Sequence, residues 1–258
     1  MPASTQPSED ELVELQRTLY SSRNPTRRWL HHGRREWVLR AIAACLPTAS
    51  DGASAALEVG PGSGIYLPPL LDAFDHVVAS DIEPRYLRAI GLEAERLSLV
   101  VDDITNSALG TETYDLVLCT EVIEHIGDSQ AALCEMHRVL RPGGTLLLTT
   151  PQRHSSMELA CRVAFAPGMI YIARRVYREP VIETGHINLL SRQDAIEQLM
   201  GAGFRIHEEW LCGLYLPGIA ELMGERAARA ARHLERRWRT GRLSFLLWTQ
   251  CYVARKGA

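Results

Sequence analysis

Two carboxylates and an imidazole stand close together in residues 120–125 (TEVIEH). If a helix begins here, Glu121, Glu124 and His125 occupy positions i, i+3 and i+4, which share one helix face. Side chains of these types ligate divalent ions. Without an ion, His125 is a candidate general base, because an imidazole with a pKa near neutrality accepts a proton at working pH. The segment is the first candidate for catalytic chemistry, and a buried, hydrogen-bonded histidine is the alternative.

A second candidate site begins at Glu58, in residues 58–64 (EVGPGSG), where an apolar run ends. A glycine turn between a strand and a helix lets the backbone approach a ligand, and an acid about 20 residues later can bind ribose hydroxyls. Asp81 stands at that separation from Gly60. The spacing alone fits a nicotinamide dinucleotide nearly as well. Glu58 disfavours that ligand, because a carboxylate attracts a cation and repels a pyrophosphate.

Both candidate sites fall where predicted strands end. Short apolar runs predict the strands Ala55–Val59, His76–Ser80, Leu97–Val101, Tyr114–Thr120 and Thr145–Thr150. Helices are predicted between them up to Leu71, over Glu83–Ala89 and over Ser129–Leu140. This alternation predicts a parallel, doubly wound α/β sheet with helices on both faces. The carboxyl ends of such strands open at the switch-point crevice, so we expect both sites there.

The flanking regions predict a helical lead-in, further elements and two insertions. The elements are two helices within Asp10–Leu46, a helix from its cap Ser191 to Met200, a strand from Gly203 to Leu211, an arginine-rich helix over Glu225–Arg242, and a closing edge strand over Leu246–Ala254. About forty residues after Pro151 lack a clear pattern and are a candidate lid. We therefore expect a lead-in over residues 1–46 and one domain over 47–258, with lid insertions at about 151–190 and 213–243.

Composition excludes several classes of protein. The 258 residues are 46% hydrophobic, enough for one sizeable core. The formal net charge of -3 argues against a nucleic-acid partner, because affinity for a phosphate backbone needs a basic surface. The six cysteines are scattered without a Cys-x-x-Cys pair, as expected of reduced thiols.

Neither a secretory signal nor a membrane-spanning helix is predicted, since the N-terminus is polar and arginines interrupt the most apolar insertion, Met157–Tyr177. We therefore expect a cytoplasmic protein. Peripheral membrane contact stays open, because that insertion mixes apolar residues with arginines, and Glu225–Arg242 carries seven arginines against two glutamates.

Residues 58–64 resemble motif I of class I S-adenosylmethionine-dependent methyltransferases, E/D-x-G-x-G-x-G. The resemblance continues through Asp81-Ile82, Asp103-Ile104 and residues 114–117 (YDLV), and covers about residues 55–150. It implies a Rossmann-like seven-stranded sheet and S-adenosylmethionine as the cofactor. Arg35 resembles a carboxylate-binding arginine of related enzymes, with Arg34 as the alternative. The implied cofactor-binding residues are Arg35, Glu58, Gly60, Gly62, Gly64, Asp81, Ile82, Asp103, Ile104 and Thr120.

Residues 120–125 resemble the E-x-x-E-H element of ubiquinone-biosynthesis O-methyltransferases and of small-RNA 2′-O-methyltransferases. There the element binds a divalent ion, usually magnesium, together with a later histidine that His186 matches. The resemblance implies Glu121, Glu124, His125 and His186 as metal ligands, with Glu124 and His125 also catalytic. Such an ion chelates two neighbouring oxygens, lowers the pKa of a hydroxyl and orients it. Two imidazoles also suit Mn²⁺, because Mg²⁺ prefers oxygen ligands.

The sequence thus predicts an S-adenosylmethionine-dependent enzyme that methylates a hydroxyl of a small molecule, such as a catechol, vicinal diol, quinone precursor or natural product. One alternative is a metal-independent N- or C-methyltransferase of a secondary-metabolite pathway. Another is a protein that binds S-adenosylmethionine without turnover. An RNA 2′-O-methyltransferase is disfavoured by the acidic net charge. His154 follows the fifth strand, but a single loop histidine does not join the catalytic set.

Overall fold

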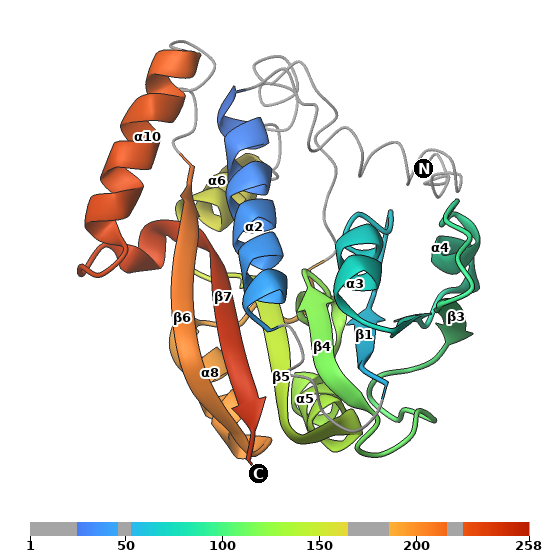
Figure 1. The fold of residues 1–258 in the computed structure, drawn as a ribbon. Coiled ribbons are helices and arrows are strands. Elements are labelled where there is room, and N and C mark those ends of the chain that lie inside the picture. Colours follow the sequence, from blue (N-terminus) through green and yellow to red (C-terminus); the bar gives the residue numbers. More distant parts are fainter. Residues whose placement is uncertain (1–24, 46–52, 165–185, 216–223, 258) are drawn as a thin grey trace, which may run out of the picture.

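The computed structural model describes residues 25–45, 53–164, 186–215 and 224–257, which form a seven-stranded sheet between layers of helix (Figure 1). The strands are β1 (Ala55–Val59), β2 (His76–Asp81), β3 (Leu97–Val101), β4 (Tyr114–Thr120), β5 (Leu140–Pro151), β6 (Phe204–Leu214) and β7 (Leu247–Lys256). Their order is β3-β2-β1-β4-β5-β7-β6, with β1 to β5 parallel and β7 antiparallel to both its neighbours. The predicted fold class is confirmed.

Helices cover both faces of the sheet, with α2 and α3 on one face and α5 and α8 on the other (Figure 1). The described helices are α2 (Pro25–Ala44), α3 (Leu67–Ala73), α4 (Pro84–Arg88), α5 (Ser129–Val139), α6 (Ser156–Ala164), α8 (Arg192–Gly201) and α10 (Glu225–Trp238), with 3-10 turns η1 (Ile123–His125) and η2 (Ser244–Leu246). Ser191 caps α8 as predicted, in a capping box with Asp194.

Successive side chains of a strand point to opposite faces, so each buried parallel strand feeds two cores. Leu57 and Val59 of β1 join the core beneath α5 and α8. Ala56 joins the core beneath α2 and α3, which is the face that alternation also assigns to Glu58. Packing on both faces holds the carboxyl ends of β1, β2 and β4 in fixed positions.

The last strand is not the predicted edge strand. β7 lies between β5 and β6, and β6 forms the edge. Residues 247–252 of β7 are buried in an unbroken row, as expected of an interior strand. The apolar run predicts a strand but carries no information on which strands flank it. The first predicted N-terminal helix, residues 165–185 and residues 216–223 lie outside the described residues.

The outer face of α10 is basic. Its exposed arginines are Arg226, Arg229, Arg232, Arg236 and Arg237. The helix ends at Trp238, before the predicted Arg242. Among the described helices, none has the length and apolar character needed to cross a bilayer.

Candidate active site

An open cavity of about 630 Å³ lies at the carboxyl ends of β1 to β4. The strand order turns back at β1, which pairs with β2 on one side and β4 on the other, so this edge is the switch point of the sheet. The cavity walls include Gly60, Gly62, Ser80, Asp81, Ile82, Glu83, Asp103, Ile104, Glu121, Val122 and His125. The volume is within the range of small-molecule and cofactor sites.

The turn after β1 requires glycine at Gly60. Its φ of +64° is unfavourable for other residues, and a Cβ there would lie 2.4 Å from Cγ2 of Val122. Gly60 and Gly62 line the cavity, whereas Gly64 closes the turn behind them, donating its N–H to the carbonyl of Pro61 at 2.9 Å. The turn therefore presents backbone, not side chains, to a ligand.

Glu58 is a buried carboxylate two residues before Gly60, and it is not itself among the residues that line the cavity. The residue is 1% exposed, and neither carboxylate oxygen has a hydrogen-bond partner within the described part of the chain. Burial raises the pKa of Glu58 to about 8. A nearby positive charge on a ligand would favour the ionised carboxylate, so the site is suited to a cation.

The ends of β2 and β3 contribute two acid–isoleucine pairs. Asp81 accepts a hydrogen bond from the backbone N–H of Glu83 at 2.9 Å, and burial raises its pKa. Ile82 borders the cavity and is 61% exposed, so a ligand ring could cover it. Asp103 borders the cavity but is held in its own loop by the N–H and hydroxyl of Thr105, while Ile104 is mostly in the core.

Arg34, not Arg35, is connected to this site through Glu121, which lines the cavity, although Arg34 itself is not a lining residue. Arg34 is buried in α2 and forms an ion pair with Glu121, at 2.6 Å between Nη1 and Oε2. Arg35 is half-buried and is not among the residues that line the cavity. Thr120, the last residue of β4, also lies outside the lining.

The helix that would place Glu121, Glu124 and His125 on one face does not form. Glu121 has a left-handed φ of +55°, and a single 3-10 turn, η1, follows. Glu121 accepts a hydrogen bond from Thr149 and Glu124 accepts one from Thr150, each at 3.0 Å. Because Thr149 and Thr150 are consecutive in β5, the two carboxylates are anchored on opposite faces of the sheet.

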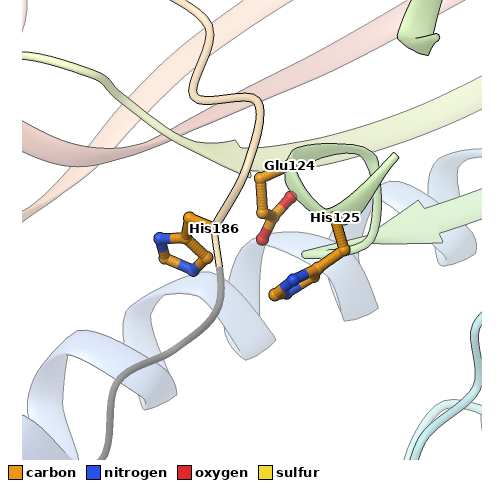
Figure 2. Close-up of side chains that lie close together, drawn as sticks. All are labelled: Glu124, His125 and His186. Carbon is orange, nitrogen blue, oxygen red and sulfur yellow. The ribbon is translucent and has the colours of Figure 1, made fainter. Parts of the chain in front are cut away.

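Glu124, His125 and His186 form one cluster, with candidate ligand atoms all within 4.8 Å of one another. Figure 2 shows the Glu124 carboxylate between the two imidazoles, whose centroids are 5.2 Å apart. Glu124 is 0% exposed, and its Oε1 has no hydrogen-bond partner in the described residues. Burial, and then the charge of Glu121, raise the pKa of Glu124 well above its usual range. Within the described residues, Glu121 is not a member of the cluster.

Backbone contacts lock His186 to the η1 turn. The N–H groups of Ile187 and Asn188 both donate to the carbonyl of Glu124 at 3.0 Å. The side-chain amide of Asn188 donates to the carbonyl of Ile126 at 3.0 Å. A histidine distant in sequence is thereby fixed beside Glu124 and His125.

Sequence reasoning missed Glu158, which comes from α6 in the predicted lid region. Its Oε1 lies 3.4 Å from Nδ1 of His186, and the residue is 7% exposed. No motif spacing relates Glu158 to the other acids, so only the packing of α6 identifies it. His154, in contrast, is exposed.

The Arg34–Glu121 pair yields a stability prediction. Arg34→Met should lower the free energy of unfolding by about 3 kcal/mol, because it leaves a largely buried carboxylate uncompensated beside Glu124. Urea denaturation measures this change. Glu121→Gln alone should also destabilise, whereas the double variant Arg34→Met/Glu121→Gln should recover much of the loss. Additive losses in the double variant would show that the two charges do not stabilise each other.

Comparison with known proteins gives a match to one family model and to curated relatives over part of the chain. Residues 57–148 match the family model described as a methyltransferase domain. A "probable S-adenosylmethionine-dependent methyltransferase" of Mycolicibacterium smegmatis is 28% identical over 166 residues, which is 64% of this chain and 57% of that protein. The ubiquinone biosynthesis O-methyltransferase of Cereibacter sphaeroides is 33% identical over 102 residues, 38% of this chain and 41% of that protein. The chain thus spans about half the length of the curated relatives it matches.

Solved structures share the fold over more of the chain. A chain of the complex between the Haloferax volcanii Trm112 methyltransferase activator and a methyltransferase superposes with a TM-score of 0.61, at 18% identity, covering 99% of this chain and 100% of that one. The [4+2]-cyclase SpnF superposes with a TM-score of 0.56 at 17% identity, covering 86% and 81%. At these identities the likeness concerns the fold alone, and this fold hosts more than one chemistry.

Proposed function

We propose that the chain transfers the methyl group of S-adenosylmethionine to a hydroxyl oxygen of a small acceptor, because residues 57–148 match a methyltransferase domain and a relative is named as S-adenosylmethionine-dependent. The observation that carries the proposal is that the cavity and the cluster of Glu124, His125 and His186 share a residue. His125 lines the cavity at the switch point and also belongs to the cluster with Glu124 and His186. A donor held in the cavity would therefore face groups that can bind and deprotonate an acceptor.

The residues around the cavity fit S-adenosylmethionine. The carboxylate of Glu58 has no partner among the described residues, and the cofactor carries positive charge. A Cβ at Gly60 would fill the space where the backbone can approach a ligand. In the proposed complex Asp81 binds the ribose hydroxyls and Ile82 covers the adenine. When bound, the cofactor supplies an electrophilic methyl group on a sulfonium.

The cluster of Glu124, His125 and His186 fits a divalent ion, because a buried carboxylate oxygen without a partner lies beside two imidazoles. An ion held there supplies Lewis acidity that lowers the pKa of an acceptor hydroxyl. One carboxylate and two imidazoles favour Mn²⁺ over Mg²⁺. We leave Glu121 out of the proposed ligands because it pairs with Arg34. Without an ion, His125, which is exposed to the cavity, would instead be placed to accept the hydroxyl proton.

The choice of oxygen as acceptor has support from a relative and from the cluster. The Cereibacter sphaeroides relative is named as an O-methyltransferase, and a chelating ion suits a catechol or vicinal diol. A metal-independent N- or C-methyltransferase would use His125 alone as its base. Peripheral membrane contact and the exclusion of nucleic-acid partners stay predictions from the sequence.

Calorimetry and an acceptor screen test the proposal. We expect S-adenosylmethionine to bind with or without a divalent ion. Mass detection should then find methylated catechols or diols in the presence of Mn²⁺, with turnover at least about tenfold lower in excess chelator. Absence of cofactor binding would overturn the whole proposal. Methylation of nitrogen or carbon that is insensitive to the chelator would replace the oxygen acceptor and the ion.

A further inference from the structure

We propose that Glu158 is a positioning residue that orients the imidazole of His186 for ion binding, an inference that rests on the metal-assisted function proposed above. The carboxylate lies on the Nδ1 side of the ring, with Oε1 3.4 Å from Nδ1. A neutral imidazole that donates from Nδ1 presents its other nitrogen, Nε2, as the lone-pair ligand. Glu158 would thus select the tautomer that suits the cluster.

Burial makes this contact significant. The side chains of His186 and Glu158 are 11% and 9% exposed. A buried carboxylate is costly unless it is paired, and His186 is the ion-pair partner of Glu158 in the described part of the chain, where no arginine or lysine reaches it. Nδ1 of His186 has no hydrogen-bond partner there, and the Glu158 carboxylate at 3.4 Å is its ion-pair contact. Each group is therefore the available partner of the other.

The helix that carries Glu158 is firmly placed. At the start of α6, Ser156 donates its hydroxyl to the carbonyl of Leu246 at 3.0 Å, and the N–H of Glu158 donates to the hydroxyl of Ser155 at 3.2 Å. His186 is fixed from the other side through the carbonyl of Glu124. A ring held between two anchored elements needs only a small shift of the carboxylate to form a full hydrogen bond.

Glu158 is not one of the three proposed ion ligands. Its oxygens are not among the atoms of Glu124, His125 and His186 that gather within 4.8 Å. The arrangement places it behind His186, where a carboxylate raises the basicity of the imidazole and fixes the ring plane. Loss of such a partner typically weakens metal affinity by about 10- to 100-fold.

The first experiment measures Mn²⁺ affinity of the full chain by electron paramagnetic resonance. Glu158→Gln, which keeps the size of the side chain, should weaken Mn²⁺ binding by about 10- to 100-fold. Glu93→Gln, the same change at an exposed glutamate, is the matched control and should leave the affinity unchanged. S-adenosylmethionine affinity should be unaffected in both variants. If Glu158→Gln binds Mn²⁺ as tightly as the wild type does, the proposed role of Glu158 is wrong, while the proposed ion site stays in place.

A second experiment needs no variant and no ion. Nitrogen-15 NMR of the histidines in the wild-type protein should show His186 as the tautomer protonated at Nδ1. The tautomer protonated at Nε2 would overturn the inference even if Mn²⁺ binds. If the wild-type protein binds no Mn²⁺, the proposed ion-assisted function is itself wrong, and the role of Glu158 falls with it.

Discussion

Glu124→Gln is expected to abolish ion-dependent methyl transfer while sparing S-adenosylmethionine binding. Glu124 is the fully buried carboxylate of the cluster, and its Oε1 has no partner in the described residues. Glutamine keeps the shape and an oxygen for Thr150 but removes the charge that would hold a cation between two imidazoles. Steady-state turnover with Mn²⁺ should fall by about 10²- to 10³-fold, as for loss of a preorganised electrostatic contact.

Glu121→Gln is the informative control for this variant. The E-x-x-E-H resemblance implies that both glutamates are ligands, whereas the structure anchors them on opposite faces of β5. Mn²⁺ affinity should therefore stay within about threefold of wild type in Glu121→Gln, with circular dichroism confirming a folded protein despite the lost pair with Arg34. Equal loss of Mn²⁺ binding in the two variants would show that Glu121 is a ligand after all. Unchanged turnover in Glu124→Gln would remove Glu124 from the mechanism.

The sheet and the turn after β1 could be predicted from sequence because local and global signals agree there. Glu58, Gly60 and Asp81 stand at or just after the ends of short apolar runs, which specify buried strands. Gly60 and Asp81 line the cavity, and Glu58 is buried at the turn. The strand periodicity does not depend on distant contacts. The strand order does depend on distant contacts, so the apolar run of β7 predicts a strand but not its position between β5 and β6.

The loop after β4 shows why the site was only partly predictable. Helical spacing suggested that Glu121, Glu124 and His125 share a face, but Glu121 adopts φ +55° and turns toward Arg34. In that conformation Glu121 pairs with the buried arginine of α2, a tertiary contact that no local pattern of residues 120–125 encodes. Likewise, adjacent Arg34 and Arg35 cannot be told apart without the rotation of α2 against the sheet.

His186 can be predicted from the sequence, whereas Glu158, its ion-pair partner, cannot. His186 was identified through resemblance to a family element, and the structure brings it to Glu124 and His125. Glu158 has no counterpart in that resemblance and becomes visible only when α6 packs beside His186. Residues that touch ligands leave motifs, whereas residues that orient them depend on how insertions pack.

The affinity for S-adenosylmethionine is expected to rise with pH and to level off above about pH 8, because of Glu58. Burial raises the pKa of Glu58 to about 8, so the unliganded protein holds a proton there at lower pH. The cationic cofactor should lower that pKa and expel the proton on binding, since one unit of lowering is worth about a factor of ten in affinity. Calorimetry at pH 6 to 9, in buffers of different ionisation enthalpy, measures both the affinity and the proton released.

Glu58→Gln should remove this linkage. At pH 8.5 its affinity for S-adenosylmethionine should be at least about tenfold weaker than that of the wild type, and it should no longer vary with pH. In the wild type, the contribution of Glu58 to stability is fully present below its ordinary pKa of 4.5 and is lost as the pH rises to about 8, because burial raises the pKa of Glu58 in the folded protein to about 8. The unliganded Glu58→Gln variant should therefore become more stable relative to the wild type as the pH rises. Glu83→Gln, an exposed glutamate of the same cavity, should change neither property. A flat affinity from pH 6 to 9 without proton release would mean that Glu58 does not balance the charge of the cofactor.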